Sequence, residues 1–325
     1  MSASTPDGRI GVVVMAYGTP ATPDDVEPYY THIRRGRPPT PDQLANLQIR
    51  YDALGGTSTL AARTADQVAT IAAALDRLQP GRFTTALGQK HAFPFIEDGV
   101  ATLAETGVRS IIGVVLAPHY SGFSVGEYQS RVAAAAAEAG LPSAAIERWH
   151  DLAEYRAFLA AAVRDGLVGL PPRTEVVFTA HSLPERVLDG DPYPNELRAS
   201  AEAAAALVGV RERGIIDGPR SLDDARWSIA WQSAGATPEP WRGPDILEVI
   251  RERAANREVA GILVCPQGFV SDHLEVAYDL DIEAARVAAD AGIAFARTRV
   301  LNDDAVVLDA LAARIAAVAP MVPAR

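Results

Sequence analysis

The sequence has little sulfur and no excess of positive charge. Its 325 residues include one cysteine, Cys265, and three methionines. A single cysteine cannot form an internal disulfide or supply the thiolates of an iron–sulfur cluster. The 41 acidic residues outnumber the 30 Lys and Arg residues, and the formal net charge of −11 repels polyphosphates. We therefore expect a reducing cytosolic environment and no nucleic-acid partner.

Long hydrophobic runs are also missing. The best candidates are residues 10–17, 111–118 and 259–266, well short of the roughly 20 residues that cross a bilayer. Residues 1–8 are small and polar, and the apolar run that follows them has no basic flank and no A-x-A cleavage site. We expect no transmembrane segment, no signal peptide and a cytoplasmic location.

Three nucleotide and metalloprotease motifs are absent. The sequence contains no G-x-G-x-x-G, no G-x-x-x-x-G-K-[ST] and no H-E-x-x-H. Dinucleotide oxidoreductases, P-loop NTPases and zincin proteases depend on these residues for phosphate or zinc binding. The sequence therefore lacks the residues that the chemistry of these three classes needs.

What the sequence does contain is an alternation of short β-branched runs with longer segments of helical period. This pattern is typical of βα units around a buried parallel sheet, so we predict an α/β fold. The predicted strands are residues 9–17, 83–88, 110–117, 143–149, 174–181, 227–233 and 259–265. The predicted helices are residues 41–53, 60–78, 94–106, 125–139, 152–166, 193–208, 245–256, 272–291 and 303–319.

The number of elements predicts two domains, because it exceeds a single small doubly wound unit. We place the first domain at residues 1–117 with a C-terminal segment of about 300–325, and the second at 118–299. The C-terminal helix is expected to pack on the first domain. Residues 209–226 have no apolar period and are interpreted as a surface insertion.

Polar side chains gather where the predicted strands end. His181 ends one strand, and Glu275 lies just inside the helix that follows another. Ligands of open α/β sheets bind beyond the carboxyl ends of the strands, where imidazole and carboxylate groups can handle protons and divalent metals. The structural alternatives are a hydrogen-bonded strand-end histidine and a capping box from Asp272 to Glu275. The remaining histidines of these regions are interpreted as structural or supporting: His32, His91, His119 and His150.

Three carboxylates follow one another at helical spacing. Glu275, Asp279 and Glu283 are separated by four residues each, so one helix face carries all three. A solvated acidic face is the simple interpretation. The alternative is a row of hard oxygen ligands that passes hydrated divalent ions toward Glu275.

One basic patch interrupts the acidic background. Arg34, Arg35 and Arg37 lie within four positions, and Arg50 with Tyr51 follows nearby. Guanidinium groups grip carboxylates in bidentate fashion, so this patch can bind a small polyanion. A solvated basic loop is the alternative.

Taken together, the motifs resemble those of the ferrochelatase family over nearly the whole chain. The segments that carry the resemblance are MAYGTP at 15–20, YYTHIRRGRPP at 29–39, RYDALGGTSTL at 50–60, GQKHAFPFIEDGV at 88–100, VLAPHYSGFSVGEY at 115–128, FTAHSLPERV at 178–187, GDPYPNEL at 190–197, WQSAGATPEPWRGPD at 231–245 and GFVSDHLEVAYDLDIE at 268–283. The resemblance implies insertion of ferrous iron into a porphyrin. It also implies two Rossmann-like domains, each a parallel sheet flanked by helices, with the active-site cleft between them.

The resemblance also implies roles for individual residues. His181 and Glu275 correspond to the iron site and to the catalytic groups. The helical spacing after Glu275 adds Asp279 and Glu283 as candidate metal ligands. Tyr17 corresponds to the axial ligand of the iron product. The residues implied in porphyrin and propionate contacts are Arg34, Arg50, Tyr51, Ser58 and Tyr128.

Tyr17 indicates which branch of the family, and therefore which porphyrin substrate, the chain resembles. A tyrosine in MAYGTP resembles the branch that acts on coproporphyrin III and makes iron coproporphyrin III, or coprohaem. The arginine patch agrees, because a tetracarboxylate needs more cationic partners than a dicarboxylate does. The alternatives are a protoporphyrin IX ferrochelatase that makes haem directly, a non-catalytic haem or porphyrin carrier, and a cobalt or nickel chelatase.

Further expectations concern cofactors and partners. Fe²⁺ enters as a substrate, no [2Fe–2S] cluster is expected, and an accessory divalent ion is compatible with the face of Glu275, Asp279 and Glu283. We expect a monomer that makes transient contacts with neighbouring enzymes of haem biosynthesis.

Overall fold

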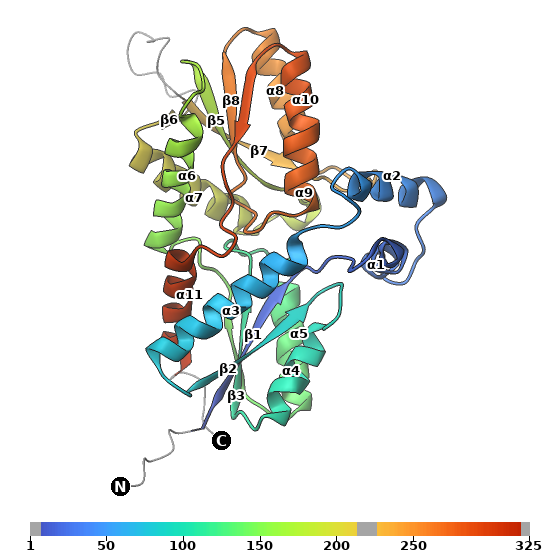
Figure 1. The fold of residues 1–325 in the computed structure, drawn as a ribbon, viewed down its shortest axis with the longest axis vertical. Coiled ribbons are helices and arrows are strands. Elements are labelled where there is room, and N and C mark those ends of the chain that lie inside the picture. The colour runs from blue at the N-terminus through green and yellow to red at the C-terminus, as the bar shows by residue number, and fades with distance from the viewer. Residues whose placement is uncertain (1–7, 213–225, 320–325) are drawn as a thin grey trace. The chain divides into compact units, whose positions relative to one another are not determined.

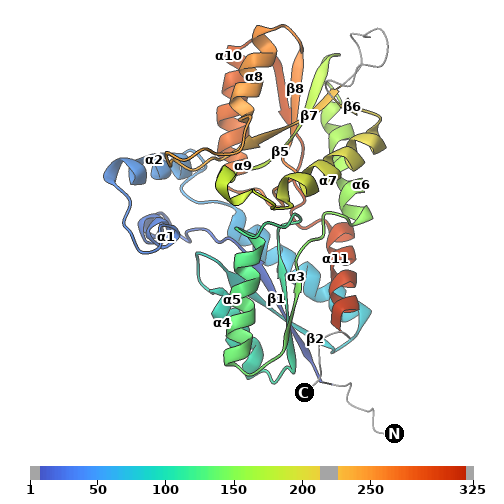
Figure 2. The ribbon, with the colours of Figure 1, turned by 180° about the vertical axis from the view of Figure 1, so that it is seen from behind.

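The computed structural model describes residues 8–212 and 226–319. These residues form two compact units, one built from the described chain up to Trp149 together with the segment from Asn302 onward, and the other from His150–Leu301. Each unit contains one parallel sheet with helices on both faces (Figures 1 and 2). The predicted α/β class with two parallel sheets is confirmed. None of the described helices is long and apolar enough to cross a membrane.

The sheet of the first unit has the strand order β2-β1-β3-β4, and all its pairs are parallel. Its strands are β1 (Ile10–Ala16), β2 (Phe83–Gln89), β3 (Ser110–Val115) and β4 (Ser143–Ile146). Its helices are α1 (Val26–Ile33), α2 (Pro41–Asp52), α3 (Leu60–Leu78), α4 (Ile96–Glu105), α5 (Val125–Glu138) and α11 (Ala305–Val318). Figures 1 and 2 show α3 and α11 on one face of this sheet and α4 and α5 on the other.

The sheet of the second unit has the order β6-β7-β5-β8-β9, again with parallel pairs. Its strands are β5 (Thr174–His181), β6 (Arg211–Glu212), β7 (Arg226–Gln232), β8 (Gly261–Cys265) and β9 (Ala294–Arg297). Its helices are α6 (Ala153–Leu167), α7 (Tyr193–Val208), α8 (Ile246–Ala255), α9 (Leu274–Val276), a π-helix (Ala277–Ala284) and α10 (Ala285–Asp290). Helices α6 and α7 cover one face, and α8 and α10 cover the other (Figure 1).

The central strands are buried on both faces, which explains their continuous apolar sequence. Every residue of β1 and β8 is buried, and so is all of β5 except His181 at its end. Burial of this kind contributes a stabilising free energy of about 25 cal/mol per Å² of apolar surface, and it holds the strands and their ends in place. The strand ends are therefore rigid supports for the polar residues that follow them.

The prediction of one continuous helix at 272–291 is wrong. The segment begins with three residues of α9, continues as the π-helix Ala277–Ala284 and ends as α10. Its N-cap is His273 instead of Asp272, because the His273 side chain accepts a hydrogen bond from the Glu275 backbone N–H. Asp272 pairs with Arg297 at 3.0 Å, so the alternative of a capping box from Asp272 to Glu275 does not form.

The structure also places elements where the sequence suggested none. Helix α1 and the short strands β6 and β9 were not predicted. The expected boundary at 117/118 falls inside the first unit, because β4 pairs in parallel with β3. Helix α11 packs against α3. Most of the expected insertion, residues 213–225, lies outside the described residues.

Candidate functional site

His181 is the last residue of β5, and its ring orientation is fixed by the turn that follows. Its Nδ1 donates a hydrogen bond to the carbonyl of Ser182, so Nδ1 carries a proton. The Ser182 N–H donates to the Gln232 carbonyl at 2.8 Å. The Tyr193 hydroxyl donates to the His181 carbonyl at 3.3 Å. These contacts leave Nε2 of His181 as the nitrogen that is available for chemistry.

Glu275 faces this nitrogen from the start of α9. Its Oε1 lies 3.4 Å from Nε2 of His181, and the two side chains are 36% and 34% exposed. The Gln232 side chain donates to the Glu275 carbonyl at 2.8 Å, which ties the start of α9 to β7. The structure therefore brings the two predicted residues together at a place that solvent can reach.

The electrostatics of the pair favour a charged imidazole. Burial lowers the pKa of His181, but the neighbouring Glu275 carboxylate more than compensates and raises this pKa to about 9. An imidazolium next to a carboxylate must release its proton before Nε2 can bind a metal ion. The pair can therefore exchange a proton for a metal ion or accept a proton from a substrate.

Aromatic side chains surround His181. The rings of Phe269 and Trp241 each have their centres 6.5 Å from the His181 ring. Phe269 is held close because Gly268 packs directly on β5, where a Cβ at position 268 would lie 2.5 Å from the Cβ of Ala180. The approach of this loop to β5 thus requires a residue without a side chain.

The two other predicted metal ligands lie further along the same segment. Asp279 is buried and accepts a hydrogen bond of 2.5 Å from the Ser233 hydroxyl, whereas Glu283 is half-buried. Within residues 8–212 and 226–319, no group of three or more His, Cys, Asp or Glu side chains is arranged to hold a metal ion. The paired groups at this site are thus His181 and Glu275.

In the first unit, Tyr17 follows β1 directly. Its side chain is exposed, at 44%. The next residue, Gly18, has φ of +94°, a conformation that favours glycine, and its carbonyl accepts a hydrogen bond of 3.0 Å from Tyr29. The turn after β1 is therefore fixed in a way that presents the phenol ring at the surface of the unit.

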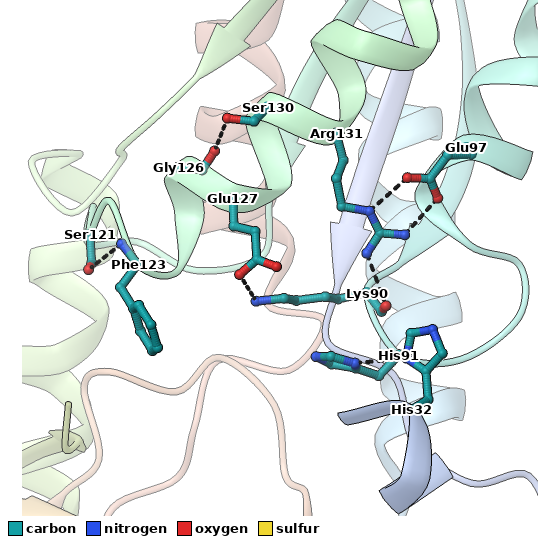
Figure 3. Close-up of polar contacts among 10 residues, drawn as sticks. All are labelled: His32, Lys90, His91, Glu97, Ser121, Phe123, Gly126, Glu127, Ser130 and Arg131. Carbon is teal, nitrogen blue, oxygen red and sulfur yellow. Dashed lines mark hydrogen bonds and ion pairs between the residues drawn. The ribbon is translucent and has the colours of Figure 1, made fainter. Parts of the chain in front are cut away.

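The first unit also contains a network of charged residues, drawn in Figure 3. The Lys90 ammonium is 2.7 Å from Glu127 and lies 5.2 Å from the ring centre of Tyr128, which is buried. Burial also raises the pKa of Tyr128 well above its usual value, so this phenol stays protonated. Arg131 binds both carboxylate oxygens of Glu97, at 2.7 and 2.6 Å. The Lys90 and Arg131 cations thus connect the end of β2 with α4 and α5.

The other predicted porphyrin contacts are on or next to α1 and α2. Arg34 lies at the end of α1, beside the Tyr30 ring, and its Nε donates to the Arg37 carbonyl at 3.2 Å. Arg50 is half-buried on α2, and the adjacent Tyr51 is buried. Ser58 accepts a hydrogen bond from the Leu60 N–H at 3.2 Å, so its hydroxyl contributes to the start of α3.

One pair of side chains was missed by the sequence reasoning. His32 and His91, separated by 59 positions, face each other with their Nδ1 atoms 3.0 Å apart. Burial, together with Lys90 and His32, lowers the pKa of His91 to about 3, so its ring is neutral. No local pattern joins two residues at this separation, and only the arrangement of α1 against the loop after β2 reveals the pair.

The segment Gly122–Gly126 matches the G-x-S-x-G pattern of serine hydrolases. In those enzymes the serine sits on a sharp strand-to-helix turn. Here β3 ends at Val115, and Ser124 is the N-cap residue of α5. The match therefore lacks its structural context.

Comparisons with known proteins agree with these observations. The family model described as ferrochelatase matches residues 9–318. The coproporphyrin III ferrochelatase of Geobacillus kaustophilus is 40% identical over 309 residues, which is 93% of this chain and 93% of the relative. That of Bacillus subtilis is 38% identical over 311 residues, 94% of this chain and 96% of the relative.

A solved structure supports the fold independently. SirB from Bacillus subtilis with Fe³⁺ matches with a TM-score of 0.56 and covers 95% of this chain and 94% of its own, at 11% identity. This likeness concerns the fold alone. The family match and the near full-length relatives together show that the chain belongs to the ferrochelatase family.

Proposed function

We propose that this chain inserts ferrous iron into coproporphyrin III and makes iron coproporphyrin III, a step of haem biosynthesis. The observation that carries this proposal is the pairing of His181 with Glu275 at 3.4 Å, with both side chains accessible to solvent. Relatives named coproporphyrin III ferrochelatase, at 38–40% identity over more than nine-tenths of the chain, support the substrate.

The reaction exchanges two protons for one metal ion. Fe²⁺ sheds water and binds to the four nitrogens of the macrocycle, and two pyrrole N–H protons leave. Because Nδ1 of His181 is occupied by the Ser182 carbonyl, Nε2 is the atom that receives either the iron or a pyrrole proton, once its own proton has been released. Glu275 takes the other of these two tasks. A two-group site suits transfer, since three or four strong protein ligands would retain the iron.

The residues of the first unit are assigned to the macrocycle. We assign Tyr17 as the axial ligand of the iron product because its phenol is exposed. Within the described part of the chain Arg34 has no carboxylate partner, so its guanidinium is available for a propionate. The further contacts to porphyrin and propionates are assigned to Arg50, Tyr51, Ser58 and Tyr128.

The decisive test compares two substrates. The full chain is incubated anaerobically with Fe²⁺ and either coproporphyrin III or protoporphyrin IX, and the metalloporphyrin is followed by absorption. We expect faster turnover, as kcat/KM, with coproporphyrin III. Equal or faster turnover with protoporphyrin IX would contradict the proposed branch, and no turnover with either porphyrin would point to a carrier.

We also assign an accessory divalent ion to the face of Glu275, Asp279 and Glu283. Among the described residues these carboxylates do not converge on one ion, so the assignment is of a hydrated ion that passes from one carboxylate to the next along a single helical segment. Titration calorimetry with Mg²⁺ tests this assignment. Glu283→Gln should bind Mg²⁺ more weakly, and unchanged binding would contradict it. The monomeric state, contacts with neighbouring enzymes and the cytoplasmic location stay predictions.

A further inference from the structure

The histidine pair of the first unit is a hydrogen bond between two imidazoles. His32 lies on α1, His91 lies in the loop between β2 and α4, and their Nδ1 atoms are 3.0 Å apart (Figure 3). A hydrogen bond between two ring nitrogens needs one N–H group and one lone pair, so the tautomer of one ring fixes the tautomer of the other. The two rings therefore act as one unit.

Further contacts hold the His32 ring and the backbone at His91. The His32 ring stacks on Phe95, with centres 5.1 Å apart and planes at 23°. The His91 backbone N–H donates to the Tyr17 carbonyl at 2.9 Å, and the preceding carbonyl of Lys90 accepts a hydrogen bond of 3.1 Å from Arg131. The backbone at Lys90 and His91 is thus tied to the turn after β1 and to α5, and the His91 side chain is tied to α1.

The pair contacts the residue that we assign as axial ligand. The centres of the His91 and Tyr17 rings are 4.6 Å apart, and the planes are tilted by 56°. The Tyr17 side chain is 44% exposed. An exposed tyrosine changes rotamer readily, so a fixed ring packed against it limits the directions in which its oxygen can point.

We propose that His32 is a positioning residue: its hydrogen bond holds the His91 ring against Tyr17 and thereby fixes the direction of the Tyr17 phenol oxygen. This proposal rests on the proposed function, because it needs Tyr17 to bind the iron of the product. His32 itself touches neither the metal nor the porphyrin in this account. It acts through the ring of His91.

The test uses the full chain loaded with ferric coproporphyrin III. A phenolate bound to ferric iron gives a charge-transfer band in the visible spectrum, which reports the fraction of iron ligated by Tyr17. His32→Ala should lower the ratio of ligated to unligated iron about fivefold, the effect of losing one neutral hydrogen bond. His32→Phe, which keeps the stacking on Phe95, should have the same effect. His32→Asn should restore the band, because its amide reaches the position of Nδ1.

Two controls separate a positioning role from a structural one. Asp309→Asn removes an exposed ion pair with Arg77 in the same unit and should leave the band unchanged. Tyr17→Phe should abolish the band. If Tyr17→Phe abolishes it while both His32→Ala and His32→Phe keep the spectrum of the unaltered chain, the positioning role is wrong and the axial role of Tyr17 stands. If Tyr17→Phe leaves the band in place, both are wrong.

Discussion

His181 and Glu275 lie 3.4 Å apart, although they belong to different βα units. His181 ends β5, and Glu275 follows β8, the strand that pairs with β5 in parallel. Parallel neighbours end at the same edge of a sheet, so residues far apart in the sequence meet there. The carboxylate then sets the charge of the imidazole, and this coupling can be measured.

Removing the charge of Glu275 should lower the pKa of His181. Burial alone lowers this pKa, and the carboxylate raises it to about 9. In Glu275→Gln the burial effect remains and the main opposing charge is lost, so the pKa should fall well below 9. An NMR titration of the imidazole signals measures the shift. Glu202→Gln, an exposed change on α7, is the control and should leave the His181 titration as it is.

Arg34 should distinguish porphyrins by their number of carboxylates. Loss of one charge-assisted hydrogen bond weakens binding by about tenfold to a hundredfold. Arg34→Ala should show this loss with coproporphyrin III and a smaller loss with the dicarboxylate protoporphyrin IX, as measured by fluorescence quenching. Arg77→Ala, an exposed arginine in the same unit, is the control. Equal losses for the two porphyrins would mean that Arg34 has a structural role.

Acid stability should depend on the contact between Glu97 and Arg131. The hydrogen bonds from Arg131 hold the pKa of Glu97 below its usual 4.5. A carboxyl whose folded-state pKa is lowered stabilises the protein above the unfolded-state value, and this contribution is lost as the pH falls through the lowered pKa. The unaltered chain should therefore lose more stability below about pH 4.5 than Glu97→Gln does.

Urea unfolding near pH 7 and near pH 3 measures this difference. The free energies of unfolding of the two proteins should differ near pH 7 and converge near pH 3. Glu105→Gln serves as the control. The Glu105 carboxylate is exposed on the same helix, and it has no cationic partner among the described residues. A difference that stays constant with pH would show that Glu97 stabilises by packing alone.

Gly268 should be intolerant of any side chain. A Cβ there would lie 2.5 Å from the Cβ and 2.8 Å from the Cα of Ala180, next to His181. Gly268→Ala should cost about 1–3 kcal/mol of unfolding free energy and reduce iron insertion, because the loop that carries Phe269 must move away from β5. Gly243→Ala meets no atom closer than 3.8 Å and should be nearly neutral. Unchanged stability and activity in Gly268→Ala would refute the close approach.

The sequence predicted the buried central strands well because their apolar pattern is local. The buried strands β1, β5 and β8 are continuous apolar runs, and the polar residues after them mark the strand ends. Only Ile146 of the four residues of β4 is buried, so its sequence pattern is weak, and the expected boundary at 117/118 assigned this strand to the second domain. Its membership of the first sheet depends on pairing with β3, which no local pattern encodes.

Other features depend on tertiary contacts and were not predictable. The π-helix differs from an α-helix only in its hydrogen-bond register, which the same apolar spacing does not distinguish. His273 replaces Asp272 as the N-cap because Arg297 binds Asp272. His32 lies in the segment YYTHIRRGRPP, but its contact with His91 appears only when α1 brings the two residues together.

The most direct test of the central claim is iron insertion by His181→Ala and Glu275→Gln under anaerobic conditions. With coproporphyrin III as substrate, each change should lower kcat/KM by about 10²–10⁴, the usual contribution of one proton-transfer group. Far-UV circular dichroism should stay unchanged, and Glu202→Gln should keep full activity. If both His181→Ala and Glu275→Gln insert iron at the rate of the unaltered chain, this pair is not the site of metal insertion.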